Sequence, residues 1–177
     1  GTCRRQRQMC IRDRYRNAVS LIADRSSPSE LFASGKLLGR PSAGRMSMFF
    51  YDPKFKQRLP YYDTFPLVLP LEPMKGGFIG LNFHYLPYGA RFAFLQQLQK
   101  YSSNAKFDQS TKIQASYNAI KGNKYTKASI KRYLYSHVRS QFLRVNVNEM
   151  ALAAYLPVAQ FQGATLGQVF ARSRKTF

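Results

Sequence analysis

The stretch GGFIGLNFHYLP, residues 76–87, decides the fold class. Its glycine pair supplies a turn, and apolar residues at every second position from Ile79 to Tyr85 then alternate with small or polar ones until the proline ends the run. A period of two is typical of a strand with one buried face. The pattern therefore predicts a half-buried strand after the turn, with His84 on its outward face.

Three further segments also have strand character. Residues 46–51 are almost wholly apolar and stop at an Asp-Pro turn, and residues 141–147 alternate between apolar and polar. Residues 65–71 alternate as well, but Pro66 and Pro70 cannot donate to a ladder, so we expect this strand at a sheet edge. Short strands joined by tight turns favour an antiparallel meander that curls into a small barrel.

Between residues 87 and 140 the apolar period becomes that of helices. Residues 94–101 predict one helix, residues 110–122 a second with a serine N-cap and a C-terminal glycine, and Thr126 can cap a third. At 100° per residue the third helix gathers its basic residues on one face. The predicted fold class is α+β: a small antiparallel β-barrel or curled sheet, with a helical insertion carrying a basic helix. A last helical turn or two is expected at residues 165–172.

The chain divides into three parts by composition. Residues 1–16 form a dense arginine tract whose MCIRDR core resembles translated adapter sequence. We interpret this tract as an artefactual or disordered basic tail, the alternative being a nucleic-acid-binding arm. Residues 17–43 are expected to form an N-terminal helical segment and linker, and residues 44–177 a single α+β domain.

Charge indicates the class of partner. The chain has 28 basic and 8 acidic residues, a net charge of +20, and removing the six arginines and one aspartate of residues 1–16 still leaves +15. Nucleic acid or an acidic protein surface is therefore expected. Between Asp108 and Glu149 no acid occurs among eight basic residues: Lys112, Lys121, Lys124, Lys127, Lys131, Arg132, Arg139 and Arg144. Apolar runs are far shorter than the roughly 18 residues of a membrane span, so no membrane partner is expected.

Candidate catalytic groups are few. The acids are scattered, and the nearest approach to a metal-dependent nuclease is Asp63 with Glu72 and Lys75, whose spacing does not match the usual carboxylate core. Solvated surface charge is the preferred interpretation of these acids. The two histidines have no partner at ligand spacing, and packed or hydrogen-bonded imidazoles are expected. Phosphate loops and nucleophile motifs are absent from the sequence. We therefore expect no enzyme, metal, cofactor or small-molecule substrate.

Two segments are candidates for DNA binding. The first is the predicted basic helix with the loop before it and the strand after it, which supply Lys121, Lys124, Lys127, Lys131, Arg132, Arg139 and Arg144. The alternative is a merely solvated helix face. The second interleaves aromatics with Lys54, Lys56 and Arg58. Phe55, Tyr61 and Tyr62 either stack on unpaired bases or pack inside the barrel, and the sequence leaves both open.

Several runs resemble a known family. They are MSMFFYDPKFKQRLPYYDTFPLVLP (46–70), GFIGLNFHYLP (77–87), IKRYLYSHVRS (130–140) and YLP (155–157). Over roughly residues 30–175 the chain resembles the DNA end protector, a head-completion protein of T-even-type tailed phages and marine cyanophages. The resemblance implies a virion protein of the phage head, also present in the host cytoplasm during assembly and after injection. It implies binding to the ends of linear double-stranded DNA, protection from exonuclease, and contacts with phage head or neck proteins. A structural neck or baseplate protein without enzymatic activity is the alternative, and a nuclease a third.

Overall fold

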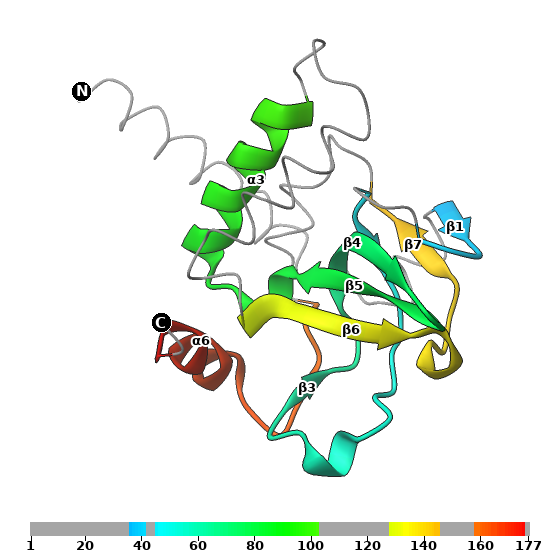
Figure 1. Cartoon of the computed structure of the whole chain (residues 1–177). Helices are drawn as coiled ribbons and strands as arrows, with labels where there is room; N and C mark the ends of the chain where they lie inside the picture. Colours follow the sequence, from blue (N-terminus) through cyan, green and yellow to red (C-terminus); the bar gives the residue numbers. More distant parts are fainter. Residues whose placement is uncertain (1–35, 42–44, 103–127, 146–157, 176–177) are drawn as a thin grey trace.

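The computed structural model describes residues 36–41, 45–102, 128–145 and 158–175 (Figure 1). Six strands form one sheet in the order β1-β7-β2-β4-β5-β6, and two short strands pair separately. Every strand pairing in this part of the chain is antiparallel. The strands are β1 (Lys36–Leu38), β2 (Ser47–Met48), β3 (Tyr62–Asp63), β4 (Leu67–Met74), β5 (Gly77–Asn82), β6 (Ile130–Leu134), β7 (Phe142–Arg144) and β8 (Phe161–Gln162). The α-helices are α3 (Tyr88–Ser102) and α6 (Leu166–Lys175), and the 3-10 turns are η1 (Lys56–Arg58), η2 (Phe83–Tyr85) and η4 (Tyr135–His137).

The hairpin of β4 and β5 confirms that a strand follows the glycine pair, but the strand ends at Asn82 and η2 takes the place of its predicted end at Tyr85. The prediction of a half-buried strand is wrong, because every residue of β5 except Ile79 is buried. Gly76 closes the turn with a φ of 76°, a conformation that a residue with a Cβ rarely adopts. A Cβ at Gly77 would run into the carbonyl oxygen of Tyr133 on the neighbouring strand. The second glycine therefore serves the close approach of β5 and β6, and the first serves the turn.

The predicted edge position of residues 65–71 is wrong, because β4 lies between β2 and β5. On the β2 side, however, the ladder covers only Leu67 and Val68, so β2 does not reach Pro70. On the β5 side the register shifts between Pro70 and Glu72, which is where a proline is tolerated. A central strand can hold this proline because the neighbouring strand is short.

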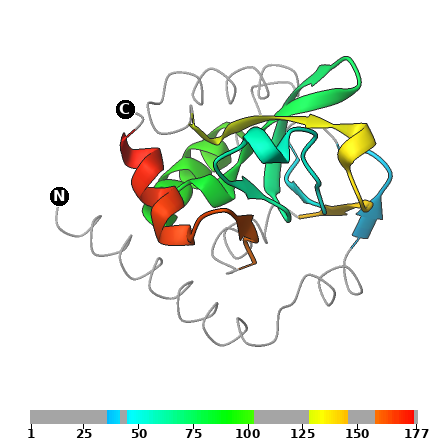
Figure 2. The same cartoon turned by 90° about the horizontal axis from the view of Figure 1, so that it is seen from below.

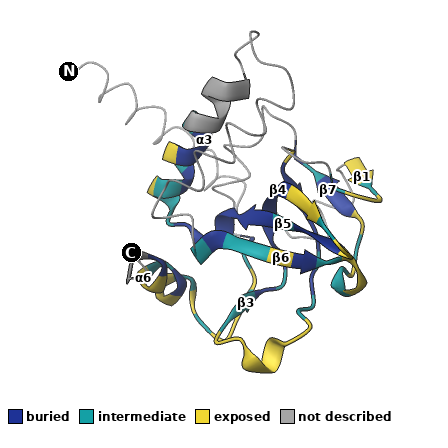
Figure 3. Cartoon of the chain, in the orientation of Figure 1, coloured by how far each residue is buried: buried dark blue, intermediate teal, exposed yellow. Residues whose placement is uncertain are grey.

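The sheet buries both of its faces (Figure 3). One face carries Leu67, Leu69 and Leu71 into an aliphatic core that also contains Phe94 and Leu95 of α3. The other face carries an aromatic cluster, which consists of Phe49, Tyr51, Val68, Phe78, Tyr133 and Phe142. The sheet does not close into a barrel, because β1 and β6 are the two ends of the strand order and are not paired with each other. The α+β class is confirmed, and the barrel is not formed.

Helix α3 confirms the helix predicted at residues 94–101 and lies with α6 at one end of the sheet, opposite β1 (Figures 1 and 2). Arg91 of α3 is 1% exposed, and its Nε and a terminal nitrogen donate to the carbonyls of Leu86 (2.7 Å) and His84 (3.0 Å). Helix α6 is tied to the same turn, because Ser173 Oγ donates to the Tyr85 carbonyl at 2.8 Å. Both helices thus fix η2, which carries Tyr85.

The predicted basic helix is wrong. Residues 130–134 form strand β6, which pairs with β5 from Gly77↔Leu134 to Leu81↔Ile130, and η4 follows. Ile130, Tyr133 and Leu134 have helical spacing, but pairing with β5 prevails because it satisfies the backbone groups along that edge of β5. The helix predicted at 110–122 lies outside the described residues.

Strand β1 falls within residues 17–43, where a helical segment and linker were expected, and it pairs with β7. The sheet therefore extends into that segment. No helix in the described ranges is both long and apolar enough to cross a membrane.

Candidate nucleic-acid interface

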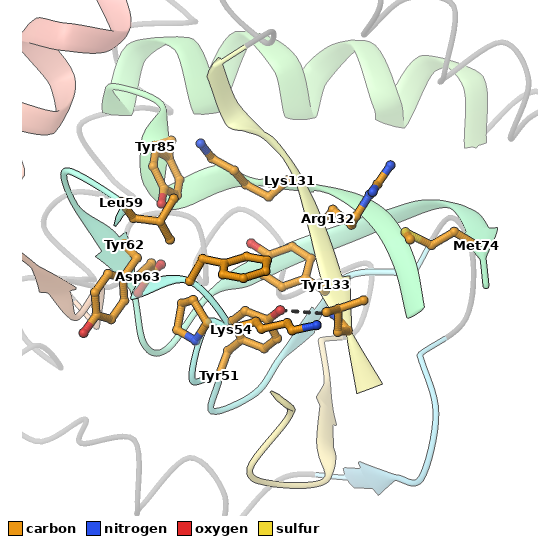
Figure 4. Close-up of a pocket in the computed structure, with 13 residues that line it drawn as sticks. Tyr51, Lys54, Leu59, Tyr62, Asp63, Met74, Tyr85, Lys131, Arg132 and Tyr133 are labelled. Carbon is orange, nitrogen blue, oxygen red and sulfur yellow. Dashed lines mark hydrogen bonds between the residues drawn. The ribbon is translucent and has the colours of Figure 1, made fainter. Parts of the chain in front are cut away.

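A cavity of about 450 Å³ lies between the segment that follows Tyr51 and strand β6 (Figure 4). Its walls come from segments distant in sequence: the turn around η1, the start of β3, the end of β4, η2 and β6. The lining residues are Tyr51, Pro53, Lys54, Phe55, Leu59, Tyr62, Asp63, Met74, Tyr85, Lys131, Arg132, Tyr133 and Leu134. Aromatic rings and cations dominate this list, and one carboxylate is present.

Strand β6 supplies two adjacent cations to the cavity. Lys131 extends toward Tyr85, whose ring centroid lies 4.3 Å from the ammonium nitrogen, and Arg132 projects from the next position in a different direction (Figure 4). Burial lowers the pKa of Lys131, because a partly desolvated ammonium group is less stable in its charged form. Among the described residues no carboxylate lies within ion-pairing distance of Lys131. An anion bound here would supply the missing charge partner.

The turn around η1 supplies an exposed aromatic ring between cations. Phe55 is 57% exposed, and Lys54 Nζ and the Arg58 guanidinium carbon lie 5.3 Å and 5.8 Å from its ring centroid. Lys56 points to a different partner, since its ammonium group donates to Asp52 at 3.1 Å. A phenylalanine side chain this exposed is unusual for a residue that packs in a core. Phe55 therefore matches the stacking interpretation of this segment.

Tyr61 matches the packing interpretation instead. It is partly buried, and its ring contacts those of Tyr85 and Phe161 at centroid distances of 5.9 Å and 6.3 Å. Packing is therefore confirmed for Tyr61, whereas stacking of bases on Phe55 stays a prediction.

Tyrosines form the inner wall of the cavity, and their hydroxyl groups are used inside the protein. The Tyr51 hydroxyl accepts from the backbone N–H of Leu134 at 3.1 Å, and the Tyr133 hydroxyl is hydrogen-bonded to the Asn82 side chain. Burial is the main cause that raises the pKa of Tyr51, Tyr85 and Tyr133. These hydroxyls stay protonated, so the three tyrosines add no charge to the wall.

Asp63 is saturated with hydrogen bonds. Its Oδ1 accepts from the backbone N–H groups of Phe65 (3.0 Å) and Gln160 (3.2 Å), and its Oδ2 accepts from Asn82 Nδ2 (3.1 Å) and lies 2.6 Å from His84 Nδ1. Burial alone would raise the pKa of this carboxyl group, but the charge and hydrogen bond of His84 and the other donors outweigh it and lower the pKa.

The surface positions predicted for Asp63 and His84 are wrong, because they are 4% and 0% exposed. The prediction of a hydrogen-bonded imidazole is confirmed for His84, and also for His137, whose Nδ1 lies 2.9 Å from the Asp52 carbonyl oxygen.

The same bonds weigh against metal chemistry at this position. Four donors occupy the lone-pair directions of Asp63, so little acceptor capacity is left for a cation. Glu72 is exposed on β4, and no group of three or more His, Cys, Asp or Glu in the described ranges is placed to hold a metal ion. The buried carboxylate serves to hold β3, η2 and the segment at Gln160 together.

The structure brings part of the predicted DNA site together. Lys54, Lys131 and Arg132 line the cavity, and Arg58 lies beside Phe55 at its mouth. Lys56 and Arg139 both approach Asp52, at 3.1 Å and 3.6 Å. Arg144 is on β7, with β2, β4 and β5 between it and β6. Lys121, Lys124 and Lys127 lie outside the described residues.

No sequence pattern predicts Tyr51, Met74, Tyr85 and Tyr133 as cavity residues. The alternation at residues 79–85 predicts only that Tyr85 lies on the buried face of a strand. Their only signal was an aromatic content of 15%, which does not reveal which rings line a cavity.

The comparisons with known proteins bear on this arrangement of rings and cations. The family model described as the Phage T4 terminal DNA protecting protein matches residues 25–175. The chain belongs to this family. The match spans β1 to α6 and therefore includes every described element that lines the cavity. No curated protein and no solved structure matches the chain. The match confirms the resemblance to phage DNA end protectors that was found in the sequence.

Proposed function

We propose that the chain binds the ends of linear double-stranded DNA in the phage head and shields them from exonuclease. The observation that supports this most is the convergence of two basic segments, Lys54 to Arg58 and Lys131 to Arg132, around one cavity. They are more than seventy residues apart in the chain, and no periodicity links them. The family makes DNA the expected polyanion.

The local charge balance favours an anionic ligand. Asp52 is shared by Lys56 and Arg139, and Asp63 is engaged with His84, so neither acid neutralises the cations at the cavity. Lys and Arg on one accessible face are what phosphate neutralisation requires, and contacts to phosphates carry no sequence information. Binding should therefore be indifferent to sequence and steeply dependent on salt.

The salt dependence tests the interface. A triple variant with Lys54, Lys131 and Arg132 changed to Gln should bind linear duplex more weakly. The slope of log affinity against log salt should fall by about 2.7, since each lost phosphate contact removes about 0.9. The matched control changes Lys36, Arg40 and Arg45 to Gln, which removes the same charge from exposed residues that do not line the cavity. Equal slopes for the two triple variants would show that only net charge matters and would remove the cavity from the interface.

Protection is tested with an exonuclease that degrades linear duplex from its ends. The protein should slow degradation, the cavity variant should not, and the protein alone with Mg²⁺ or Mn²⁺ should leave the duplex intact. Cleavage by the protein would establish a nuclease. Binding to purified phage neck proteins without any affinity for DNA would favour the structural alternative instead.

A further inference from the structure

We propose that the cavity beside β6 takes a single unpaired nucleotide at a DNA end, with its base against Phe55 and its phosphate on the surrounding cations. This inference rests on the proposed function and names the part of the DNA that the site recognises. The protein would then distinguish an end from internal duplex by the base that has left the stack.

The size of the cavity fits a single base that has left the helical stack. A volume of about 450 Å³ lies within the range of roughly 300–1,000 Å³ typical of sites for small molecules. Stacked base pairs within a duplex present only their edges in the grooves, so a pocket can enclose a base only after it leaves the stack. A base leaves the stack most easily at the end of a strand, and above all in an overhang, because it has a stacked neighbour on one side only.

The mouth of the cavity has the chemistry of a stacking platform. Phe55 is 57% exposed and Leu59 is 42% exposed, so both present apolar surface to solvent at the lining of the cavity. Lys54 and Arg58 lie over the Phe55 ring, where they can reach the phosphates flanking a stacked base. Every base has a π-face, so such a platform accepts all four.

The inner wall offers little with which to read base identity. Asp63 has four hydrogen-bonding partners, and the hydroxyl groups of Tyr51 and Tyr133 are bonded to Leu134 and Asn82. A base entering the cavity therefore meets ring faces more than unsatisfied polar atoms. Recognition by stacking and charge, without a hydrogen-bond code, suits a protein that must accept an end of any sequence.

The opposite wall supplies the phosphate site. Lys131 stands over the Tyr85 ring with its ammonium group 4.3 Å from the centroid, and Arg132 follows it on the strand. The pKa of Lys131 is lowered by burial, and a phosphate beside it would favour the charged form. The cations thus lie on both sides of the cavity, where they can meet the phosphate that links the unpaired nucleotide to the duplex and the next phosphate along the strand.

The test uses 2-aminopurine, a fluorescent base that is quenched when it stacks. Four short duplexes share one sequence: a flush end, an unpaired 2-aminopurine nucleotide at the 3′ end, the same nucleotide at the 5′ end, and an abasic nucleotide as overhang. The wild-type protein should bind at least one 2-aminopurine overhang more tightly than the abasic overhang and quench its fluorescence. Phe55→Ala should weaken binding to that overhang by about 5- to 100-fold, from the range for base–aromatic stacking, and leave the abasic overhang unaffected.

Two further variants keep the result interpretable. Leu37→Ala removes another exposed hydrophobic side chain, 38% exposed on β1 and absent from the cavity lining, and should change nothing. Phe55→Leu keeps an apolar side chain at the mouth but has no ring, so quenching should be lost even if the alanine variant folds poorly. Equal affinity of the wild type for abasic and 2-aminopurine overhangs, without quenching, would overturn the inference and leave DNA binding standing. Failure to bind any of the four duplexes would instead refute the proposed function.

Discussion

Replacing Asp63 by Asn tests whether the buried carboxylate supports the cavity wall. The substitution keeps the size of the side chain and retains one oxygen, which can still accept from the N–H groups of Phe65 and Gln160. The other oxygen becomes an amide nitrogen that faces Asn82 Nδ2 and His84 Nδ1. The Asn82 bond must be lost, because two donors then face each other, and the His84 bond loses its charge.

The magnitude follows from those two bonds. Hydrogen bonds to a charged group contribute about 1.5–3 kcal/mol each, so losing one and weakening the other should lower the free energy of unfolding by about 2–5 kcal/mol. That is a large share of the roughly 5–15 kcal/mol of a typical domain. Urea unfolding near neutral pH measures it. Glu72→Gln is the matched control, since it removes an exposed carboxylate from β4 and should change stability by less than about 0.5 kcal/mol.

The pH dependence gives the same prediction a second, independent readout. The pKa of Asp63 is lower in the folded protein than in the unfolded chain, so its stabilisation is fully present above the unfolded pKa of about 3.9. It is lost as the pH falls through the lower folded pKa. Wild type and Asp63→Asn should therefore differ most near neutral pH and converge below about pH 4. A variant as stable as the wild type at neutral pH, or a difference that does not shrink in acid, would refute the proposed role of this carboxylate.

Two further substitutions test the local causes of the fold. Gly77→Ala places a Cβ against a backbone carbonyl of β6 and should lower the free energy of unfolding in urea by about 1–3 kcal/mol. Gly167→Ala in α6 is the control, because a Cβ there meets no neighbouring part of the protein within 4 Å and should not lower the stability. Thr165→Ala removes a reciprocal cap in which the Thr165 Oγ1 accepts from the Gln168 N–H at 3.3 Å and the Gln168 side chain accepts from the Thr165 N–H at 2.9 Å. It should lower the free energy of unfolding by about 1 kcal/mol and reduce the helical signal in circular dichroism if α6 unravels.

Local sequence patterns predicted the elements whose determinants lie close together in the chain. The turn at Gly76, the presence of a strand directly after it, the helix at residues 94–101 and the final helix at 165–172 were predicted correctly, whereas the end of that strand and its half-buried face were not. Each is specified by a cap, a turn or a period within about a dozen residues. The expectation that proline places a strand at a sheet edge was wrong at Pro70. It depends on how far the neighbouring strand β2 extends, and the sequence of residues 65–71 holds no information about the length of β2.

The site was less predictable because its contacts are long-range. Five residues, Ile130 to Leu134, are too few to separate a period of 2 from one of 3.6, and the partner strand β5 lies some fifty residues earlier. The Asp63–His84 pair spans 21 residues with no motif to link them. The basic residues and the neighbouring rings Phe55 and Tyr62 could be predicted from local composition, but the cavity tyrosines Tyr51, Tyr85 and Tyr133 could not.

Lys131 and Arg132 lie on a strand and not on the predicted helix face, so their charges can have different roles. In the described residues β6 is an edge strand, and edge strands often carry cations that prevent pairing with other chains. Arg132 is exposed and suits that role. Lys131 does not, because it is partly buried over Tyr85, where desolvation disfavours its charge, and a charge that only repels other chains gains nothing from burial. An anion in the cavity would stabilise a cation held in such a position, so we expect Lys131, more than its exposed neighbour Arg132, to contribute to the proposed phosphate site.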